Sequence, residues 1–458
     1  MIPTRESTGE QSRTSFEKRF ERVITPFQEF IKDQTISSAI LVLCTVVALV
    51  IANSPFAGAY QTLLHTPLGF IAGDHAFSLS IQHWINEGLM GLFFFLIGLE
   101  IKRELLVGEL KDRRRSIPVM MAAFGGMLVP AAVFAVLNAG TNTQHGWGIP
   151  MATDTAFAVG ILALLGKRIP SAALTFLTAL AIMDDLGAIL VIAIFYAGQL
   201  NLATLAFSAG VLCVLVLLNL LGIRRPSVYI LGGALVWAGM LDSGVHATLS
   251  GLLVAATVPA RPKRASRWFL WRTHRLLKRF QEIEKAKEDA QPILGEEEQH
   301  AVVEQLQDVA EKTTTPLRRW ERALEQPVGL VVMPVFALAN AGIPINPGSL
   351  QYLWSEPLAA GIFLGLVAGK GMGIPLFAWL ALRLNLGQLP DSVRMTHIIG
   401  IGLLGGMGFT MSIFIANLGF EGSPEALVIA KSGILAASLV AGIGGYLWLR
   451  LRGSPPAY

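Results

Sequence analysis

The sequence is poor in charged residues and in cysteine. Only 15% of its 458 residues are Asp, Glu, Lys or Arg, against about a quarter in soluble domains. The two cysteines, Cys44 and Cys213, lie in separate apolar runs without a CxxC spacing. This pattern excludes a disulfide framework and a cysteine-based zinc site. Residues 1–35 have no apolar core of the kind found in cleaved signal peptides, so we expect the first apolar run to be a retained helix.

Long apolar runs are what the sequence has instead. Hydrophobic residues make up 53% of the chain, and the mean hydropathy is +0.56. These values are typical of a polytopic membrane protein and not of a soluble enzyme. We therefore predict an all-α polytopic membrane protein with twelve transmembrane helices. The twelve runs are at about 36–56, 84–106, 117–138, 148–165, 171–197, 201–221, 226–241, 244–259, 327–342, 357–382, 395–415 and 424–449.

Lys and Arg alternate strictly between successive connections. Neither residue occurs in six connections, at about 57–83, 139–149, 198–203, 242–245, 343–356 and 416–423. The connections between these six are basic, as are both ends of the membrane part. By the positive-inside rule, an even number of spans then places both termini in the cytoplasm. We predict cytoplasmic segments at 1–35, 260–326 and 453–458, with the spans in 36–259 and 327–452.

The long polar segment 260–326 predicts two helical stretches, at about 266–290 and 296–325. In the first stretch, aromatic and aliphatic residues are interleaved with Arg and Lys. That composition favours a helix lying on anionic lipid at 261–290. A regulatory insertion is the alternative, and the sequence does not choose between them.

The connection 57–83 contains the alternating stretch HAFSLSIQHW. Alternation of this kind predicts a small external hairpin, acting as a cap or as a contact in a homodimer. An irregular loop is the alternative.

One apolar run, 171–197, contains the adjacent carboxylates Asp184 and Asp185. A helix over this run is about 40 Å long, which places the pair near the middle of a bilayer. One Asp at that depth costs about 2.5–3.5 kcal/mol, and the second adds repulsion. We therefore expect a cation or proton site of a membrane transporter. A structural hydrogen-bond network of two buried aspartates is the alternative.

Two other runs are unsuited to a continuous helix. In 148–165, Pro150 and the polar cluster 153–155 oppose helix formation at the start of the run. The run 395–415 holds five glycines in nine residues, each costing about 1 kcal/mol relative to Ala. These runs are the middle members of spans 3–5 and 10–12, which predicts an inverted repeat with broken helices 4 and 11 around a midplane site. For the glycines, a face for close helix packing is the alternative.

A further charge, Lys370, lies near the middle of the run 357–382. A lysine buried in a membrane requires a partner, and the intramembrane acids available are Asp154, Asp184 and Asp185. We expect Asp154 to offset the positive end of a broken helix and Lys370 to offset a negative end. Neighbours on a helix point about 100° apart, so we expect Asp184 and Asp185 to divide the work, one facing the ion and one facing the lysine.

Several segments together resemble the NhaA-type sodium/proton antiporters, over about residues 36–452. They are ALAIMDDLGAI, ATDTAFA, FFLIGLEIKREL, SGVHATLSG, FALANAG, AGKGMGI and GGMGFTMSIFIA, and the double-aspartate segment is highly specific. The family is a known example of inverted-repeat transporters. The resemblance implies export of Na⁺ or Li⁺ in exchange for protons across a bacterial inner membrane, with pH regulation. We expect no enzymatic activity, no cofactor and no nucleic-acid partner.

The resemblance also implies roles for matching residues. Asp184 and Asp185 would be the exchange carboxylates, with Asp185 the direct Na⁺ or Li⁺ ligand and Lys370 the partner of Asp184. Thr153, a further ligand, and Asp154 would lie where the broken helices cross. The pH response would involve Glu100, Lys102, Arg103, Glu104, Glu321, His246 and Glu87, the last standing where the family usually has Asp. Ordinary interfacial charges are the alternative for Glu100 and Glu104, and a packing histidine for His246.

Protons and hard cations compete for the same oxygen ligands, so a site open to one side at a time exchanges them. If two groups lose protons for each sodium bound, the exchange is electrogenic. Two other functions stay open on the sequence. A proton-coupled transporter of another substrate predicts no sodium-dependent proton flux. A cation channel or sensor predicts conductance, or binding without exchange.

Overall fold

A computed structural model describes residues 34–72, 75–108, 112–262, 266–285, 297–344, 355–390 and 392–453. The predicted terminal segments 1–35 and 453–458 lie outside the described residues except for residues 34–35 and 453. The chain forms two units, which are described separately. The larger contains 34–258 and 324–458, and the smaller contains 1–33 and 259–323.

The larger unit is built almost entirely of helices, with one two-stranded hairpin near its N-terminus. Its elements are α2 (Gln34–Ala52), α3 (Ala57–His65), β1 (Pro67–Ala72), β2 (His75–Ser80), α4 (Ile81–His83), η1 (Trp84–Leu89), α5 (Met90–Val107), α6 (Arg113–Leu137), η3 (Gln144–Met151), α7 (Thr155–Leu164), η4 (Gly166–Arg168), α8 (Ser171–Phe195), α9 (Leu202–Leu220), α10 (Pro226–Leu241), α11 (Leu249–Thr257), η6 (Val328–Val332), α15 (Met333–Asn340), α17 (Pro357–Leu364), η7 (Gly365–Gly369), α18 (Lys370–Arg383), α19 (Met395–Gly405), α20 (Phe409–Gly419) and α21 (Pro424–Arg452). The helix α14 (Pro316–Pro327) begins in the smaller unit and continues into η6.

Among the described residues, eight helices are long and apolar enough to cross a membrane, or ten if two bent pairs each count as one span. The pairs are α2 with α3, bent by 112°, and α19 with α20, bent by 43°. The predicted span 244–259 contains only the nine-residue helix α11, which is about 14 Å long. The prediction of an all-α polytopic membrane protein is confirmed. The count of twelve spans and the inverted repeat stay predictions.

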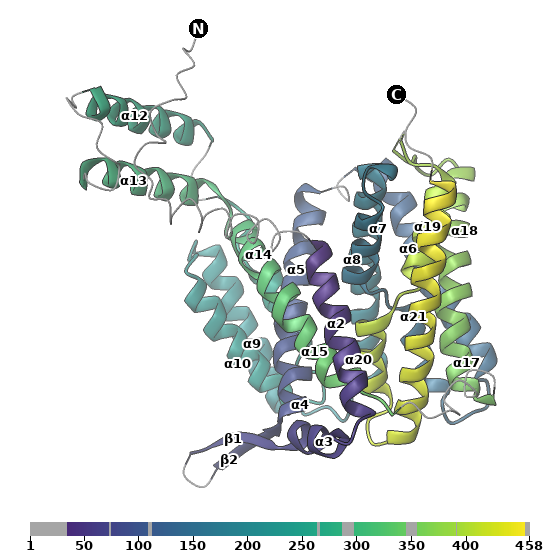
Figure 1. Cartoon of the computed structure of the whole chain (residues 1–458). Helices are drawn as coiled ribbons and strands as arrows, with labels where there is room; N and C mark the ends of the chain where they lie inside the picture. Colours follow the sequence, from purple (N-terminus) through teal and green to yellow (C-terminus); the bar gives the residue numbers. More distant parts are fainter. Residues whose placement is uncertain are drawn as a thin grey trace. The chain divides into compact units, whose positions relative to one another are not determined.

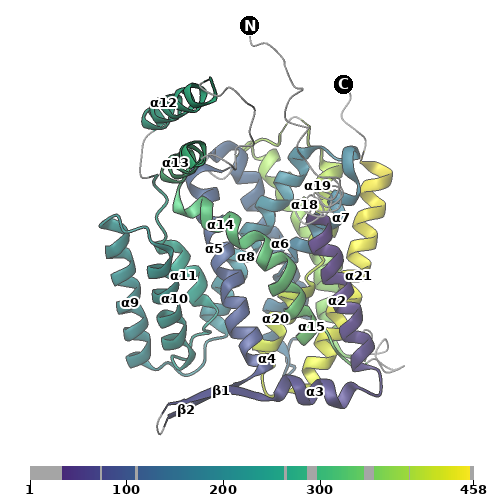
Figure 2. The same ribbon diagram turned by 60° about the vertical axis from the view of Figure 1, so that its left-hand side comes forward.

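Exposed apolar side chains mark the outer surface of this unit. On α9, Leu202, Phe207, Val214, Leu217 and Leu220 are all more than half exposed. Exposure of a continuous apolar surface is energetically unfavourable in water, whereas contact of the same surface with lipid hydrocarbon is not. The helices α9, α10 and α11 form a group whose member α11 packs on α5 (Figure 2). This surface is that of a multi-pass membrane protein.

The helices around the aspartate pair are packed closely. The helices α6 and α18 pack on each other, and a Cβ on Gly125 or Gly373 would overlap the carbonyl oxygen of the other residue. The helix α8 packs on α6, and Asp184 and Asp185 are buried on α8. The helix α6 therefore packs on both α18 and α8, the helix that carries the aspartate pair.

The connections without Lys or Arg gather at one end of the larger unit. The strands β1 and β2 pair antiparallel, from Pro67 with Ser80 to Ala72 with His75, at the end that carries α3 (Figure 1). The predicted hairpin is present, although only β2 comes from the alternating stretch and the helix α3 was not predicted. Residues from five of the six Lys/Arg-free connections line one cavity of about 750 Å³. These five connections therefore lie at the same end of the larger unit.

In the smaller unit, α12 (Ser266–Lys285) and α13 (Glu297–Thr313) pack on each other. Their shared core is Leu276, Val302 and Val309, against which Trp268, Phe269, Phe280, Ile283 and Leu306 pack. Much of the apolar face that was predicted to lie on lipid is thus covered by α13. The residues 286–290 of the predicted stretch lie outside the described residues.

The second predicted stretch, 296–325, is divided into α13 and the first part of α14. The helix α14 begins at Pro316, which has no amide hydrogen and disfavours the helical conformation at Thr315. The prediction of one continuous stretch was therefore wrong, and the reason is the proline.

Candidate functional site

Two interrupted helices cross in the larger unit. Residues 152–154 are non-helical between η3 and α7, and residues 406–408 separate α19 from α20. The Asp154 amide donates a hydrogen bond of 2.5 Å to the Met407 carbonyl. Backbone groups freed by one break are thus satisfied by the other, as the interior of a membrane protein requires.

One carboxylate caps both interrupted helices. Asp154 is the N-cap of α7, where its Oδ1 accepts a 3.2 Å hydrogen bond from the Phe157 amide. Its Oδ2 accepts from the amide and the hydroxyl of Thr410, over 2.9 and 2.5 Å, in the first turn of α20. Helix N-termini carry free amides and partial positive charge, so a carboxylate is favourable there. The structure places Asp154 at two positive helix ends, where the sequence indicated one.

Lys370 and Asp184 form an ion pair in which both side chains are fully buried, with 2.6 Å between Nζ and Oδ2. Lys370 also donates to the hydroxyl of Thr153 over 2.5 Å. That hydroxyl lies 2.7 Å from Asp184 Oδ2 and 3.1 Å from the Gly405 carbonyl, and its single proton serves one of them at a time. The Thr153 hydroxyl therefore lies between Lys370 and the Gly405 carbonyl at the end of α19.

Asp185, the next residue of α8, lacks contacts of the kind that Asp184 forms. It is 4% exposed, and it has no hydrogen bond or ion pair to any described residue. Asp184, Glu100 and Asp154 repel its charge, and Lys370 attracts it. A buried carboxylate without a partner is costly in its charged form, so Asp185 requires a proton or a cation. The Oδ1 of Asp184 is also without a partner among the described residues, which leaves two oxygens for a hard cation such as Na⁺.

Three of the predicted pH-response residues form contacts near the C-terminal end of α5. Lys102 donates to the carbonyls of Ala256 and Val258, over 2.6 and 2.5 Å, and so caps the end of α11. Arg103 and Glu104 form an ion pair of 2.5 Å. The Lys102 hydrogen bonds join α5 to the end of α11, whereas the Arg103–Glu104 pair lies within α5.

Two further acidic residues of the predicted pH-response set, Glu100 and Glu321, are in different units. Glu100 is half-buried on α5, and its negative charge repels that of Asp185. Glu321 belongs to the smaller unit, where its carboxylate lies 3.9 Å from the guanidinium of Arg318.

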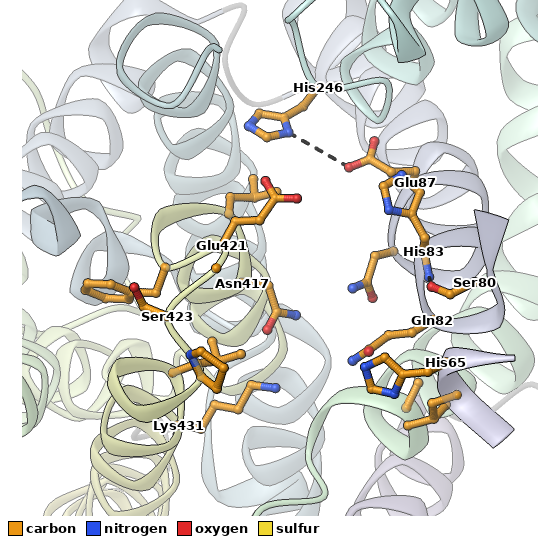
Figure 3. Close-up of a pocket in the computed structure, with 18 of the residues that line it drawn as sticks. His65, Ser80, Gln82, His83, Glu87, His246, Asn417, Glu421, Ser423 and Lys431 are labelled. Carbon is orange, nitrogen blue, oxygen red and sulfur yellow. Dashed lines mark hydrogen bonds and ion pairs between the residues drawn. The ribbon is translucent and has the colours of Figure 1, made fainter. Parts of the chain in front are cut away.

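Glu87 and His246 face each other in the large cavity (Figure 3). His246, in the connection between α10 and α11, lies 3.9 Å from Glu87 through Nδ1 and 2.8 Å from the Tyr196 carbonyl through Nε2. Burial lowers the pKa of His246, but Glu87, the Tyr196 carbonyl and Glu421 outweigh it and raise the pKa above its ordinary value. The Thr248 amide donates to the second oxygen of Glu87, over 3.1 Å. Both ring nitrogens of His246 therefore have polar partners, which hold the ring in place.

Sequence reasoning did not single out Thr410. This residue donates two hydrogen bonds to the Asp154 carboxylate, one from its amide and one from its hydroxyl. Its signal was available in the segment GGMGFTMSIFIA, because a hydroxyl residue directly after a glycine-rich break is suited to a helix terminus.

Comparison with known proteins gives one consistent result. Residues 28–449 match the model of the family described as Na⁺/H⁺ antiporter 1. A protein of Saccharophagus degradans named Na(+)/H(+) antiporter NhaA 1 is 46% identical over 438 residues, which cover 96% of this chain and 94% of that protein. Proteins named Na(+)/H(+) antiporter NhaA from Sulfurimonas denitrificans and Syntrophobacter fumaroxidans are 45% and 42% identical, over 95% and 99% of this chain and 97% and 96% of their own lengths.

Proposed function

Because the chain belongs to the Na⁺/H⁺ antiporter 1 family and is a sodium/proton antiporter rather than an enzyme, we propose that Asp185 is the carboxylate that binds the sodium ion. Asp184 and Lys370 act beside it as a charge switch, and Thr153 supplies a hydroxyl oxygen. The observation that carries this proposal is the contrast between the neighbours: Asp184 is paired with Lys370, whereas Asp185 has no partner among the described residues.

Competition for this one site is sufficient for exchange. With a proton on Asp185, the carboxylate is neutral and stable in its buried position. A sodium ion replaces that proton and draws on the free Oδ1 of Asp184, which weakens the hold of Lys370 on Asp184. The Asp184–Lys370 pair then releases a second proton, so that two protons move for each sodium ion. Exchange with this stoichiometry is electrogenic and is driven by the membrane potential.

The proposed frame is twelve crossings, with spans 3–5 and 10–12 as an inverted repeat and both termini on the cytoplasmic side of a bacterial inner membrane. The crossing of the breaks at 152–154 and 406–408 supports the repeat. The alternation of Lys and Arg supports the orientation, as does the gathering of five Lys/Arg-free connections around one cavity. In this frame the cavity opens to the outside, and the cation leaves through it.

Cation selectivity and pH response follow from the same groups. Li⁺ is a hard cation like Na⁺ and is a second substrate of the same oxygen ligands. The pH response uses the Glu87–His246 pair on the outer side and the α5 group, Glu100 to Glu104, with Glu321. The raised pKa of His246 supports its part, because the ring then keeps its positive charge to a higher pH.

Two further contacts are proposed for the surface. A homodimer forms through the β1–β2 hairpin, because a two-stranded hairpin has free edges that pair with another strand. Anionic lipid binds the smaller unit, where Leu270, Trp271 and Leu277 of α12 are exposed beside Arg and Lys residues.

Everted membrane vesicles provide the test of the site. Sodium added to wild-type vesicles should release protons from the acidified lumen. Asp185→Asn should abolish this response at every pH. Glu304→Gln is the matched control, because it removes a surface carboxylate that is 72% exposed, and it should behave as the wild type. Undiminished exchange in Asp185→Asn would contradict the site.

The same vesicles separate the rival functions. A transporter of another substrate shows no sodium response in the wild type. A channel shows conductance in planar bilayers, and a sensor shows sodium binding without proton flux.

A further inference from the structure

The cavity at the Lys/Arg-free end contains a buried lysine that the exchange mechanism does not use. The cavity has a volume of about 750 Å³ and is lined by residues from α3, α4, η1, α15, α20 and α21 and from the connections between α8 and α9 and between α10 and α11. Lys431 lies on its wall, and Figure 3 shows the amino group directed into the space. It is the lysine of the cavity lining within the described residues.

Lys431 is almost completely buried but unpaired. Its exposed fraction is 6%, and it forms no hydrogen bond or ion pair with any described residue. It is seven residues into α21, which begins at Pro424, so it lies about 10 Å along the helix from that end. An ammonium held in this way opposes folding unless water or a mobile ion compensates its charge.

The carboxylates of the described cavity lining do not neutralise it. Glu87 is held by the Thr248 amide and by His246. Glu421 is exposed at the rim and has no ion pair to a described residue. The positive charge of Lys431 therefore acts on the water-filled space itself.

We propose that Lys431 is a specificity-determining residue of the exchange reaction, whose positive charge weakens cation binding from the cavity side. This inference rests on the proposed function, in which the cavity is the exit of the sodium ion. A sodium ion that enters the cavity is repelled by Lys431, whereas an ion that arrives at Asp185 from the other side does not pass this lysine. The result is an asymmetry that favours export over return.

The size of the asymmetry follows from electrostatics. Two unit charges about 10 Å apart across a partly hydrated space change a binding constant by about three- to tenfold. The effect is screened by salt, because the cavity is open to solvent ions. A purely structural role of Lys431 in packing predicts neither a sided effect nor a salt dependence.

The test measures the sodium concentration that gives half-maximal exchange, separately from each side, in right-side-out and everted vesicles of the full chain. Lys431→Gln should lower this value about three- to tenfold on the cavity side and leave the other side unchanged. Lys431→Arg keeps the charge and should match the wild type on both sides. Raising the ionic strength with choline chloride should reduce the difference between Lys431→Gln and the wild type.

A second variant keeps the test decisive if Lys431→Gln does not accumulate. Glu421→Lys adds a positive charge at the exposed rim of the cavity and should raise the half-maximal concentration on that side. The side to which the cavity opens is found by labelling Glu421→Cys with a membrane-impermeant maleimide, with Cys44 and Cys213 replaced by Ser.

Three results would overturn the inference. They are equal shifts on both sides in Lys431→Gln, no shift on either side, and a shift that ionic strength does not alter. A further contrary result is a half-maximal sodium concentration that differs between chloride and gluconate in the wild type but not in Lys431→Gln. The lysine would then bind an anion. Absence of sodium/proton exchange in the wild type contradicts the proposed function instead, so the two failures are distinct.

Discussion

Two regions of the larger unit each bury a lysine, and they treat its charge in opposite ways. At the crossing of the broken helices, Lys370 is fully buried and is bound to Asp184 and Thr153. In the cavity, Lys431 is 6% exposed and has no described partner. Burial alone therefore does not identify the role of a charge in a membrane. A paired charge fixes the geometry around it, whereas an unpaired one acts at a distance on whatever enters its surroundings.

The largest expected difference between the two lysines is in stability when each is removed in turn. Lys370→Met should destabilise the protein by about 3–5 kcal/mol, because Asp184 is left as an uncompensated buried charge. Lys431→Met should leave the stability unchanged or raise it slightly, because no described ion pair is lost. Thermal unfolding in detergent compares the two variants directly.

A double variant provides the control for the first change. Asp184→Asn together with Lys370→Met removes both charges and should regain most of the lost stability, but not exchange. If Lys370→Met is as stable as the wild type, Lys370 does not compensate the buried charge of Asp184.

The second prediction tests how firmly the crossing is held. Thr410→Val removes the hydroxyl that donates to Asp154 and should cost about 1.5–3 kcal/mol, as expected for a hydrogen bond to a charged group. Ser412→Ala is the matched control, because it removes a hydrogen bond to the neutral carbonyl of Ile149 and should cost about 0.5–1.5 kcal/mol. Equal losses in chemical denaturation would show that the charge of Asp154 adds nothing.

The smallest expected effect concerns the cavity and depends on pH. The pKa of His246 is raised in the folded protein, so its contribution to stability is complete below its unfolded value of about 6.5 and is lost as the pH rises through the folded value. The difference in Tm between the wild type and His246→Gln should therefore be largest at about pH 5.5 and should shrink toward about pH 9. His83→Gln, which changes an exposed histidine of the same cavity, is the matched control for the loss of a histidine side chain.

Much of the fold was predictable because the bilayer imposes a simple rule on the sequence. The apolar run 171–197 became the helix Ser171–Phe195, and 357–382 became α17 to α18. The break after residue 151 was signalled by Pro150 and a polar cluster, and the second break by glycines. The helix α3 was not predicted, because AGAYQTLLH is short and is bent by 112° from the span before it.

The site was predictable in its members but not in its bonds. The sequence indicated that Asp184 and Asp185 would point in different directions, and helix geometry was sufficient for that. It did not indicate which oxygen Lys370 would take, or that Asp154 would bind Thr410. Those pairs are separated by 186 and 256 residues, and only the packed arrangement of α7, α8, α18 and α20 brings them together.

The double cap at Asp154 has a consequence for movement. Because one side chain is bonded to the first turns of both α7 and α20, these two half-helices share an anchor point. This shared anchor opposes the separation of α7 from α20. A displacement of either half-helix away from the other breaks hydrogen bonds to Asp154, so α7 and α20 are coupled at their first turns.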